Sequence, residues 1–249
     1  MSPRGVGLAG LAVLALGGLS ACQSTQERSA DLEEQGATTL LAESGLKIEK
    51  ESTDVRVLST SLLSDPNGSA VVVRLRNDSD QDLIDVPILV RVLDAKGKTV
   101  YSNDIPGIEP ALAAVAYIPA GGEVSWVNDQ VLAAGTPKSV KVKVGTGGGT
   151  YSGQLPAIEV AAPQLEGDPV SGIKAIGEVV NRTGQEQGRL LLYVVARRGG
   201  KVVAAGRGAI EHLKAGTKPL RYDVFFIGDP SGAALEMTSF PTLPGPEPN

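Results

Sequence analysis

Short apolar runs separated by turn residues make up most of the chain after residue 54. They are rich in valine and isoleucine, and Pro, Gly, Asn and Asp residues interrupt them. A succession of such runs predicts short antiparallel strands and an all-β fold. In the first half of the chain the runs occupy residues 55–63, 69–77, 85–94, 98–102, 113–118, 122–131 and 139–144.

Two of these runs differ in how their apolar positions are arranged. The run DVPILVRVLD, residues 85–94, is apolar at positions of both parities, which predicts a central strand with both faces covered. The run SVKVKV, residues 139–144, alternates strictly. It therefore predicts a strand with one buried face and with Lys141 and Lys143 on the solvent face.

The second half of the chain repeats landmarks of the first half at a nearly constant offset. The offset is 103, 104 and 103 residues for Asp65-Pro66 with Asp168-Pro169, Asn77 with Asn181, and Gly97-Lys98 with Gly200-Lys201. Ala120-Gly121 matches Ala215-Gly216 at an offset of 95, so the first copy carries an insertion of about eight residues around PGIEPALAAVAYI. Several landmarks in the same order indicate two copies of one domain.

Each copy has about seven short strands at intervals of roughly ten residues, which predicts an antiparallel β-sandwich of immunoglobulin-like architecture. We therefore expect two tandem β-sandwiches, at residues 54–145 and 157–240. A Gly-rich linker at residues 146–156 would join them, and a Pro-rich tail at residues 241–249 would follow. The strand runs of the second copy lie at residues 172–181, 188–196, 201–208, 220–227 and 234–240.

The order of features within each copy resembles the FxLYD-like group of small extracellular β-sandwiches, which are common in bacterial envelope lipoproteins. The shared pattern is an Asn after the second strand, an aliphatic strand, a D-x-x-G-K-x-V turn, and an x-A-G turn before a late strand. The resemblance covers residues 55–145 and 157–240. It departs at the motif that names the group, of which only Asp94 remains. It implies a sandwich fold and no catalytic residues.

Residues 1–22 have the three parts of a secretory signal. Arg4 supplies the positive start, and an apolar run extends from Val6 to Leu19. This run is shorter than the ~20 residues that a membrane-spanning helix needs. It ends in Leu19-Ser20-Ala21-Cys22, which resembles the lipobox of bacterial lipoprotein signals.

The lipobox resemblance implies cleavage between Ala21 and Cys22 and acylation of Cys22, for example with palmitate. A secretory signal with a coincidental cysteine, or an uncleaved anchor, is the alternative. The lipoprotein interpretation predicts a signal peptide at residues 1–21, and an acylated N-terminus with a flexible tether at residues 22–53.

Several acyl chains would hold the protein durably on an extracytoplasmic membrane face. In Gram-negative lipoproteins an Asp directly after the acylated cysteine favours retention at the inner membrane. This chain has Gln23 there, so the resemblance implies the outer membrane if the host is Gram-negative. Otherwise we expect the outer face of the cell membrane.

Composition limits the chemistry that the chain can perform. Aromatic residues make up only 4% of the chain, so its cores must consist of Val, Leu, Ile and Ala. The single cysteine excludes an intrachain disulfide, and with a single histidine there is no His–Cys set for zinc. The formal charge of −5, or −6 once residues 1–21 are removed, argues against a nucleic-acid partner. We predict no metal and no cofactor.

Two stretches suggest chemistry but lack the rest of the corresponding motif. The stretch GTGGGTYSG, Gly145 to Gly153, has no following Lys and helix, so a linker is a better interpretation than a phosphate loop. His212 is the only imidazole, and no G-x-S-x-G nucleophile elbow accompanies it. We therefore predict a surface position for His212 and no catalytic residue.

Other distinctive residues have structural interpretations. Asn77 and Asn181 begin N-x-[ST] sequences at equivalent strand ends, where asparagine commonly bonds to nearby backbone in turns. Trp126 and Tyr222 occupy corresponding late strands, which predicts a shared core position.

These observations predict a lipid-anchored protein of the cell envelope that binds or scaffolds a protein or glycan partner without catalysis. Loops or an exposed strand edge would carry the recognition. An accessory factor of an envelope transport or assembly complex is a second hypothesis, and an extracytoplasmic hydrolase is a third. A deep pocket with clustered carboxylates would favour the hydrolase, whereas an apolar patch or a free edge would favour partner binding.

Overall fold

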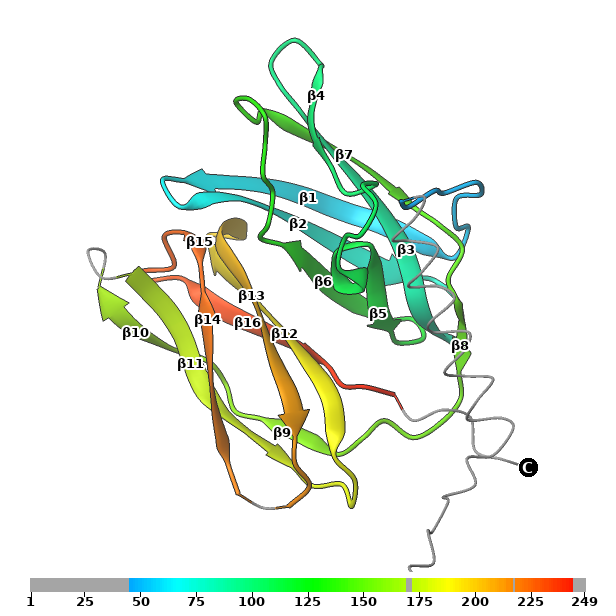
Figure 1. Cartoon of the computed structure of the whole chain (residues 1–249), viewed down its shortest axis with the longest axis vertical. Helices are drawn as coiled ribbons and strands as arrows, with labels where there is room; N and C mark the ends of the chain where they lie inside the picture. The colour runs from blue at the N-terminus through cyan, green and yellow to red at the C-terminus, as the bar shows by residue number, and fades with distance from the viewer. Residues whose placement is uncertain (1–44, 169–171, 217, 244–249) are drawn as a thin grey trace, which may run out of the picture.

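A computed structural model of the 249-residue chain describes residues 45–168, 172–216 and 218–243. It consists almost entirely of antiparallel strands that form four sheets, and its one described helical segment is a single 3₁₀ turn. Figure 1 shows a first unit, blue to green, above a second unit, yellow to red. The predicted all-β, antiparallel fold is confirmed, and the paired sheets are compatible with β-sandwiches.

The first unit contains two sheets. One has the order β1-β2-β6. In the other, the central strand β3 pairs with β4 and β5 on one side and with β7 and β8 on the other. The strands are β1 (Val55–Asp65), β2 (Gly68–Asn77), β3 (Asp82–Leu93), β4 (Thr99–Ser102), β5 (Ala114–Ile118), β6 (Glu123–Asn128), β7 (Ser139–Val144) and β8 (Gly149–Tyr151), with a 3₁₀ turn η1 (Pro110–Leu112) between β4 and β5.

The second unit repeats this arrangement. One sheet has the order β10-β11-β14, with β9 also paired to β11, and the other has the order β15-β13-β12-β16. The strands are β9 (Ile158–Val160), β10 (Gln164–Asp168), β11 (Gly172–Asn181), β12 (Gln187–Arg198), β13 (Lys201–Leu213), β14 (Leu220–Phe225), β15 (Ile227–Gly228) and β16 (Ala234–Phe240).

The strand register of the two units agrees at the position of their buried late-strand aromatic residue. Trp126 lies opposite Val73, and Tyr222 lies opposite Gly177, which is 104 residues after Val73. Trp126 and Tyr222 are both buried, so their predicted shared core position is confirmed. In the second unit, one long strand, β13, occupies the place that β4 and β5 share in the first. The predicted insertion is therefore the segment between β4 and β5.

The apolar pattern of single strands is also confirmed. Val90 and Leu89, neighbours on β3 that face opposite sides of the sheet, are both buried, as expected for a central strand. On β7, Lys141 and Lys143 are exposed, as the alternation predicted.

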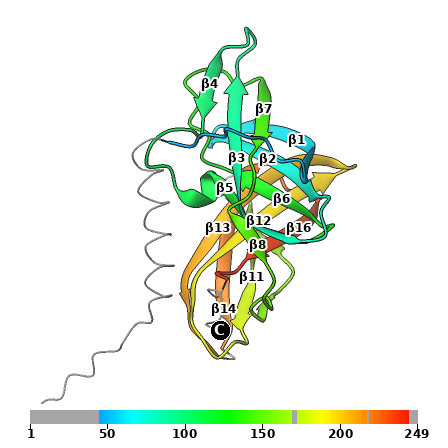
Figure 2. The ribbon, with the colours of Figure 1, turned by 90° about the vertical axis from the view of Figure 1, so that its right-hand side faces the viewer.

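The sheet of β12 and β13 is buried on both faces. Leu190, Leu192, Val194 and Ala196 belong to the core of the second unit. The intervening side chains of the same sheet join the core of the first unit, together with Phe240 of β16; they are Leu191, Tyr193, Val195 and Ala205. One layer thus serves two hydrophobic cores, and Figure 2 shows the resulting close stacking of the two units.

Three segments that we expected to be irregular connections are partly ordered. In the predicted tether, Leu46 packs against Leu89, and Ser52 N donates to Val144 O. In the predicted linker, residues 149–151 form β8 at the edge of the first unit. In the predicted tail, the Thr242 hydroxyl donates to Arg189 O and accepts from Arg189 N. Backbone pairing, a single apolar contact and a side-chain hydrogen bond, none of which needs a strong sequence pattern, explain the three differences.

Candidate binding cleft between the two units

The insertion of the first unit lies at the junction with the second. Pro110 starts the 3₁₀ turn η1, where its fixed φ and missing N–H are tolerated. Asn103, just before the insertion, is buried and donates to Leu112 O and Ile88 O, which fixes the base of the segment. As a result, the side chain of Glu109 and the carbonyl of Ala111 lie against β12 and β13.

Glu109 accepts hydrogen bonds from two arginines of the second unit. Arg207 donates from both terminal nitrogens, at 2.8 Å to each carboxylate oxygen, which is the strong bidentate geometry. Arg189 donates to one of the same oxygens, and its Nε lies 2.9 Å from Glu211. The Arg207 side chain is only 7% exposed and the Glu109 side chain 25% exposed, so this ion pair is largely shielded from water.

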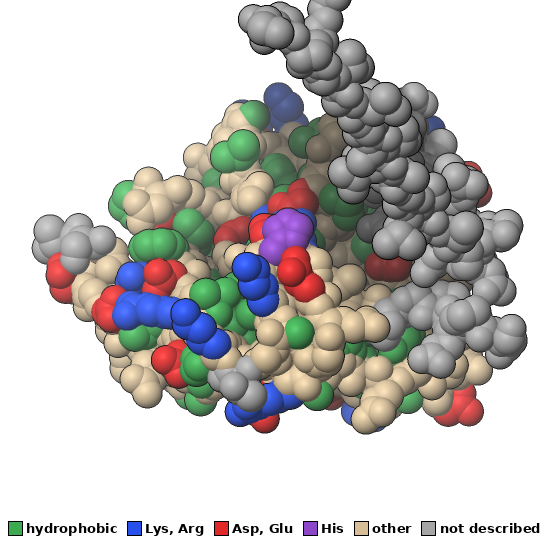
Figure 3. All heavy atoms as spheres, turned by 60° about the horizontal axis from the view of Figure 1, so that its bottom comes forward, with side chains coloured by type: hydrophobic (Ala, Val, Ile, Leu, Met, Phe, Trp, Pro, Cys, Tyr) green, Lys and Arg blue, Asp and Glu red, His purple; other side chains and the backbone are tan. Residues whose placement is uncertain are grey.

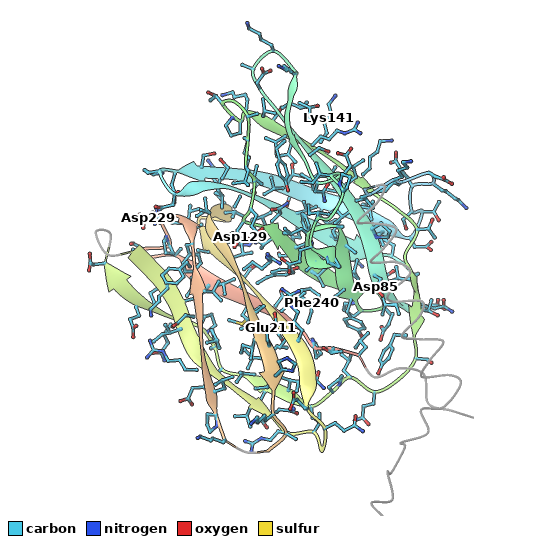
Figure 4. The ribbon with its side chains drawn as sticks, viewed as in Figure 1. Asp85, Asp129, Lys141, Glu211, Asp229 and Phe240 are labelled. Carbon is cyan, nitrogen blue, oxygen red and sulfur yellow. The ribbon has the colours of Figure 1, made fainter. Side chains whose placement is uncertain are left out.

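Asp129, which follows β6, completes the charge cluster. Its carboxylate accepts from Arg207 N at 3.1 Å and from Arg207 Nε at 3.4 Å. Figure 4 shows Asp129 between the two units. Hydrogen bonds from Arg207 lower the pKa of Glu109, against the opposing effect of burial. Burial alone would lower the pKa of Arg207, but Glu109 and Asp129 together raise it.

Aromatic side chains close the junction beside these charges. The carbonyl of Ala111 accepts from Trp126 Nε1 at 3.0 Å and from the Tyr193 hydroxyl at 3.4 Å, so one insertion residue bonds to both units. The Tyr193 and Phe240 rings meet edge to face at a centroid distance of 5.1 Å. Such pairs stabilise a fold by more than the burial of their apolar area alone would.

The β1–β2 turn makes a second contact between the units. Asp65 Oδ1 accepts from Asn67 N at 2.7 Å and from Gly68 N at 3.1 Å, which closes the predicted turn. Its other oxygen accepts from Gly228 N in β15 at 2.8 Å. One carboxylate therefore both forms a turn of the first unit and attaches it to the second.

Between these two contacts lies an open cleft of about 920 Å³. The β1–β2 turn forms one wall, and the start of β11 and the segment from β14 to β15 form the others. The cleft has an apolar part that contains Ile173, Phe226 and Ile227, and Phe225 at the rim is 63% exposed. An exposed aromatic side chain beside an apolar cleft is typical of a binding surface.

The carboxylates of the cleft are already engaged within the protein. Asp65 and Asp129 accept the hydrogen bonds described above, and Asp229 accepts from Ser231 N at 2.9 Å. The hydrogen bond from Ser231 lowers the pKa of Asp229. These groups are held by internal hydrogen bonds and shape the cleft.

The two equivalent asparagines act as buried braces. Asn77 Nδ2 donates to Gln81 O and Ile118 O, and Asn181 Nδ2 donates to Gln185 O and Leu213 O. Both side chains are buried, and the third residue of each sequon donates back to the Asn oxygen. The predicted turn role is confirmed, and the two copies share the same hydrogen-bond pattern.

The remaining sequence candidates lie elsewhere or outside the described residues. His212 is 77% exposed, and its Nδ1 lies 3.1 Å from Glu186 on the surface, as predicted. It is purple in Figure 3, next to acidic side chains. Ala21 and Cys22 lie outside the described residues, so cleavage and acylation stay predictions.

The described residues contain neither a metal-ligand cluster nor a helix that could cross a membrane. In residues 45–168, 172–216 and 218–243, no group of three or more His, Cys, Asp or Glu side chains is placed to hold a metal ion. Within the same ranges, no helix has both the length and the apolar composition needed to cross a membrane.

No protein-family model matches the chain, and no curated protein is significantly similar to it in sequence. The resemblance to FxLYD-like domains and to lipoprotein signals therefore stays a prediction.

Sequence reasoning did not identify Glu109, Arg207 or Phe225. The insertion between matched landmarks was the one signal that pointed toward Glu109, because a segment present in only one copy can contact the other copy.

Proposed function

We propose that this chain is a lipid-anchored, non-catalytic binding protein of the bacterial cell envelope, with its partner site in the cleft between the two units. The observation that carries the proposal is the exposed Phe225 beside the apolar part of a cleft that both units build. The buried Glu109–Arg207 pair holds the two walls together. A cleft formed in this way presents a preformed surface, which lowers the entropic cost of binding.

Three features support binding over catalysis. The cleft is open, its carboxylates are occupied by backbone or arginine donors, and part of its lining is apolar. An extended segment of a partner protein that carries an apolar side chain suits this surface. Phe225 and Ile227 would contact that side chain, and the exposed polar groups of the β1–β2 turn would contact the partner backbone.

The test of the cleft is site-specific photocrosslinking in cells. A photoreactive phenylalanine analogue at Phe225 should give a discrete covalent adduct. The same analogue at Leu220, which is 44% exposed on the same strand, should not. Equal adducts at both positions, or none at Phe225, would overturn the cleft as the partner site.

The test of the anchor is Cys22→Ala. We expect loss of acyl labelling and release of the chain from the membrane fraction, because the thiol is the predicted attachment atom. A variant that remains acylated and membrane-bound would refute the lipoprotein proposal. This result does not depend on the outcome at Phe225.

An accessory role in a transport or assembly complex is the second candidate. The two units built around one shared layer favour it, since they offer a broad surface rather than a closed pocket. The identity of the protein captured at Phe225 separates the two roles. A subunit of a membrane complex supports the accessory role, and a soluble protein that acts alone supports simple binding.

A further inference from the structure

The charges of the first unit are separated between two regions. Six exposed lysines belong to three neighbouring parts of the first unit: the β3–β4 turn, the start of β7, and the segment 45–50 that packs beside β3 and β7. None of the six forms an ion pair within the described part of the chain. We call them the basic face; they are Lys47, Lys50, Lys96, Lys98, Lys138 and Lys141.

Strand register shows how this surface is built. Arg91 on β3 lies opposite Lys141 on β7, and Leu89 lies opposite Lys143, so these four side chains project from the same side of the sheet. Figure 4 shows Lys141 on the outer side of β7. Leu46 packs against Leu89 on this side. The described chain therefore begins on the basic face.

The two regions differ strongly in net charge. With Arg91 and Lys143 the basic region has eight basic residues. Four acidic residues lie in the same segments or pair with them, which gives a formal charge of +4; they are Glu49, Glu51, Asp94 and Asp104. The rest of residues 45–145 has three basic and nine acidic residues, which gives −6. Arg91 and Lys143 are partly neutralised, at 3.2 Å from Asp104 and 2.7 Å from Glu51. The surface of the second unit in Figure 3 instead intermixes both signs.

We propose that the basic face lies against the anionic lipid headgroups of the membrane that holds the anchor. This inference rests on the proposed acylation of Cys22. The 23 residues from Cys22 to Ser44 can span at most about 80 Å, so the anchor confines the unit to within that distance of the lipid surface and lets the basic face reach it. Lysines near an anionic leaflet are attracted within about one Debye length, ~8 Å at physiological salt.

The position of the chain entry favours a lipid surface over an acidic protein as the partner. Because residues 45–50 lie on the basic face, a membrane anchor upstream approaches the unit from this side. The β1-β2-β6 sheet, which packs on the opposite side of β3, then points away from the bilayer. In this orientation the cleft at Phe225 is open to partners in the surrounding compartment.

The experiment uses the chain from residue 23 onward, which contains every described residue and has no acyl group. Its sedimentation is measured with vesicles of equimolar phosphatidylglycerol and phosphatidylcholine, and with phosphatidylcholine alone. We expect binding only to the anionic vesicles and a steep loss with added salt. The triple variant K96E/K138E/K141E should bind roughly tenfold more weakly or worse, since each lysine adds to the attraction.

The matched control is K201E/K214E/K218E, which changes the charge equally at three exposed lysines of the second unit. It should bind as the parent chain does, and both variants should unfold at the parent urea midpoint. Equal losses in the two variants, no binding to anionic vesicles, or equally tight binding to polyglutamate would each overturn the basic face as a lipid-facing surface. The anchor itself is judged separately, by acyl labelling of Cys22.

Discussion

At the scale of single residues, the structure depends on a few buried polar side chains that satisfy backbone groups. Asn77 is fully buried, and its amide bonds to the carbonyls of three residues, Gln81, Ile118 and Pro119. Its oxygen accepts from the amide and hydroxyl of Ser79. Asn181 repeats this role in the second unit, so at these two positions the sequence N-x-[ST] marks a buried brace and not an exposed glycosylation site.

Replacing this brace should be costly. We expect Asn77→Ala to lower the free energy of unfolding by about 2–4 kcal/mol, because buried carbonyls would lose their donor. Asn67→Ala, at an exposed turn position in the same unit, should cost no more than about 0.5 kcal/mol. Urea denaturation of both variants measures the difference. Similar losses for the two would show that the side-chain bonds of Asn77 contribute little.

At the scale of elements, strand patterns in the sequence predicted most of the sheets but not all of their edges. The apolar runs located β2, β3, β7 and β12 because their side chains are buried. The strand β8 was not predicted, because GTY pairs through backbone groups and has little side-chain pattern. The packing of segment 45–53 was not predicted for a similar reason, because it depends on isolated residues such as Leu46 and Ile48.

The close approach of β13 to β14 provides a test at this scale. A Cβ atom on Gly206 would overlap the carbonyl oxygen of Phe225, and neighbouring backbone cannot move aside easily. We expect Gly206→Ala to destabilise the protein by about 2 kcal/mol or more. Gly188→Ala on β12 meets only an ordinary contact and should change stability by less than about 0.5 kcal/mol. Thermal unfolding of the two variants checks this; equal melting temperatures would contradict the close approach.

At the scale of the whole molecule, the junction of the two units could not be predicted from the sequence. The run at residues 188–196 is apolar at positions of both parities, which indicates that both faces of the strand are covered but not that the first unit covers one of them. Glu109 and Arg207 are separated by 98 positions and belong to opposite copies. Only the insertion indicated where the two copies differ, and nothing in its composition identified Glu109 as the residue that pairs.

The Glu109–Arg207 pair predicts how stability depends on pH. The pKa of Glu109 is lowered in the folded state, so the stabilisation is present above its usual value of 4.5 and is lost as the pH falls below it. We expect Glu109→Gln to lose about 2 kcal/mol at neutral pH. The difference from the parent chain should shrink in acid.

Melting temperatures measured from neutral to acidic pH test this expectation. Glu123→Gln, which alters an exposed ion pair with Arg74, is the control and should cost less than about 1 kcal/mol. A constant difference between parent and Glu109→Gln at all pH values would show that the carboxylate charge does not stabilise the junction.

The sheet shared by the two cores also affects how this chain can evolve. Tandem copies can recombine, be lost or multiply as long as each copy covers its own apolar surface. Here a second unit alone would expose Leu191, Tyr193 and Val195 to water, an apolar row on a sheet that invites aggregation. Loss of the first unit alone would leave this face uncovered, so we expect the two units to be retained or lost together.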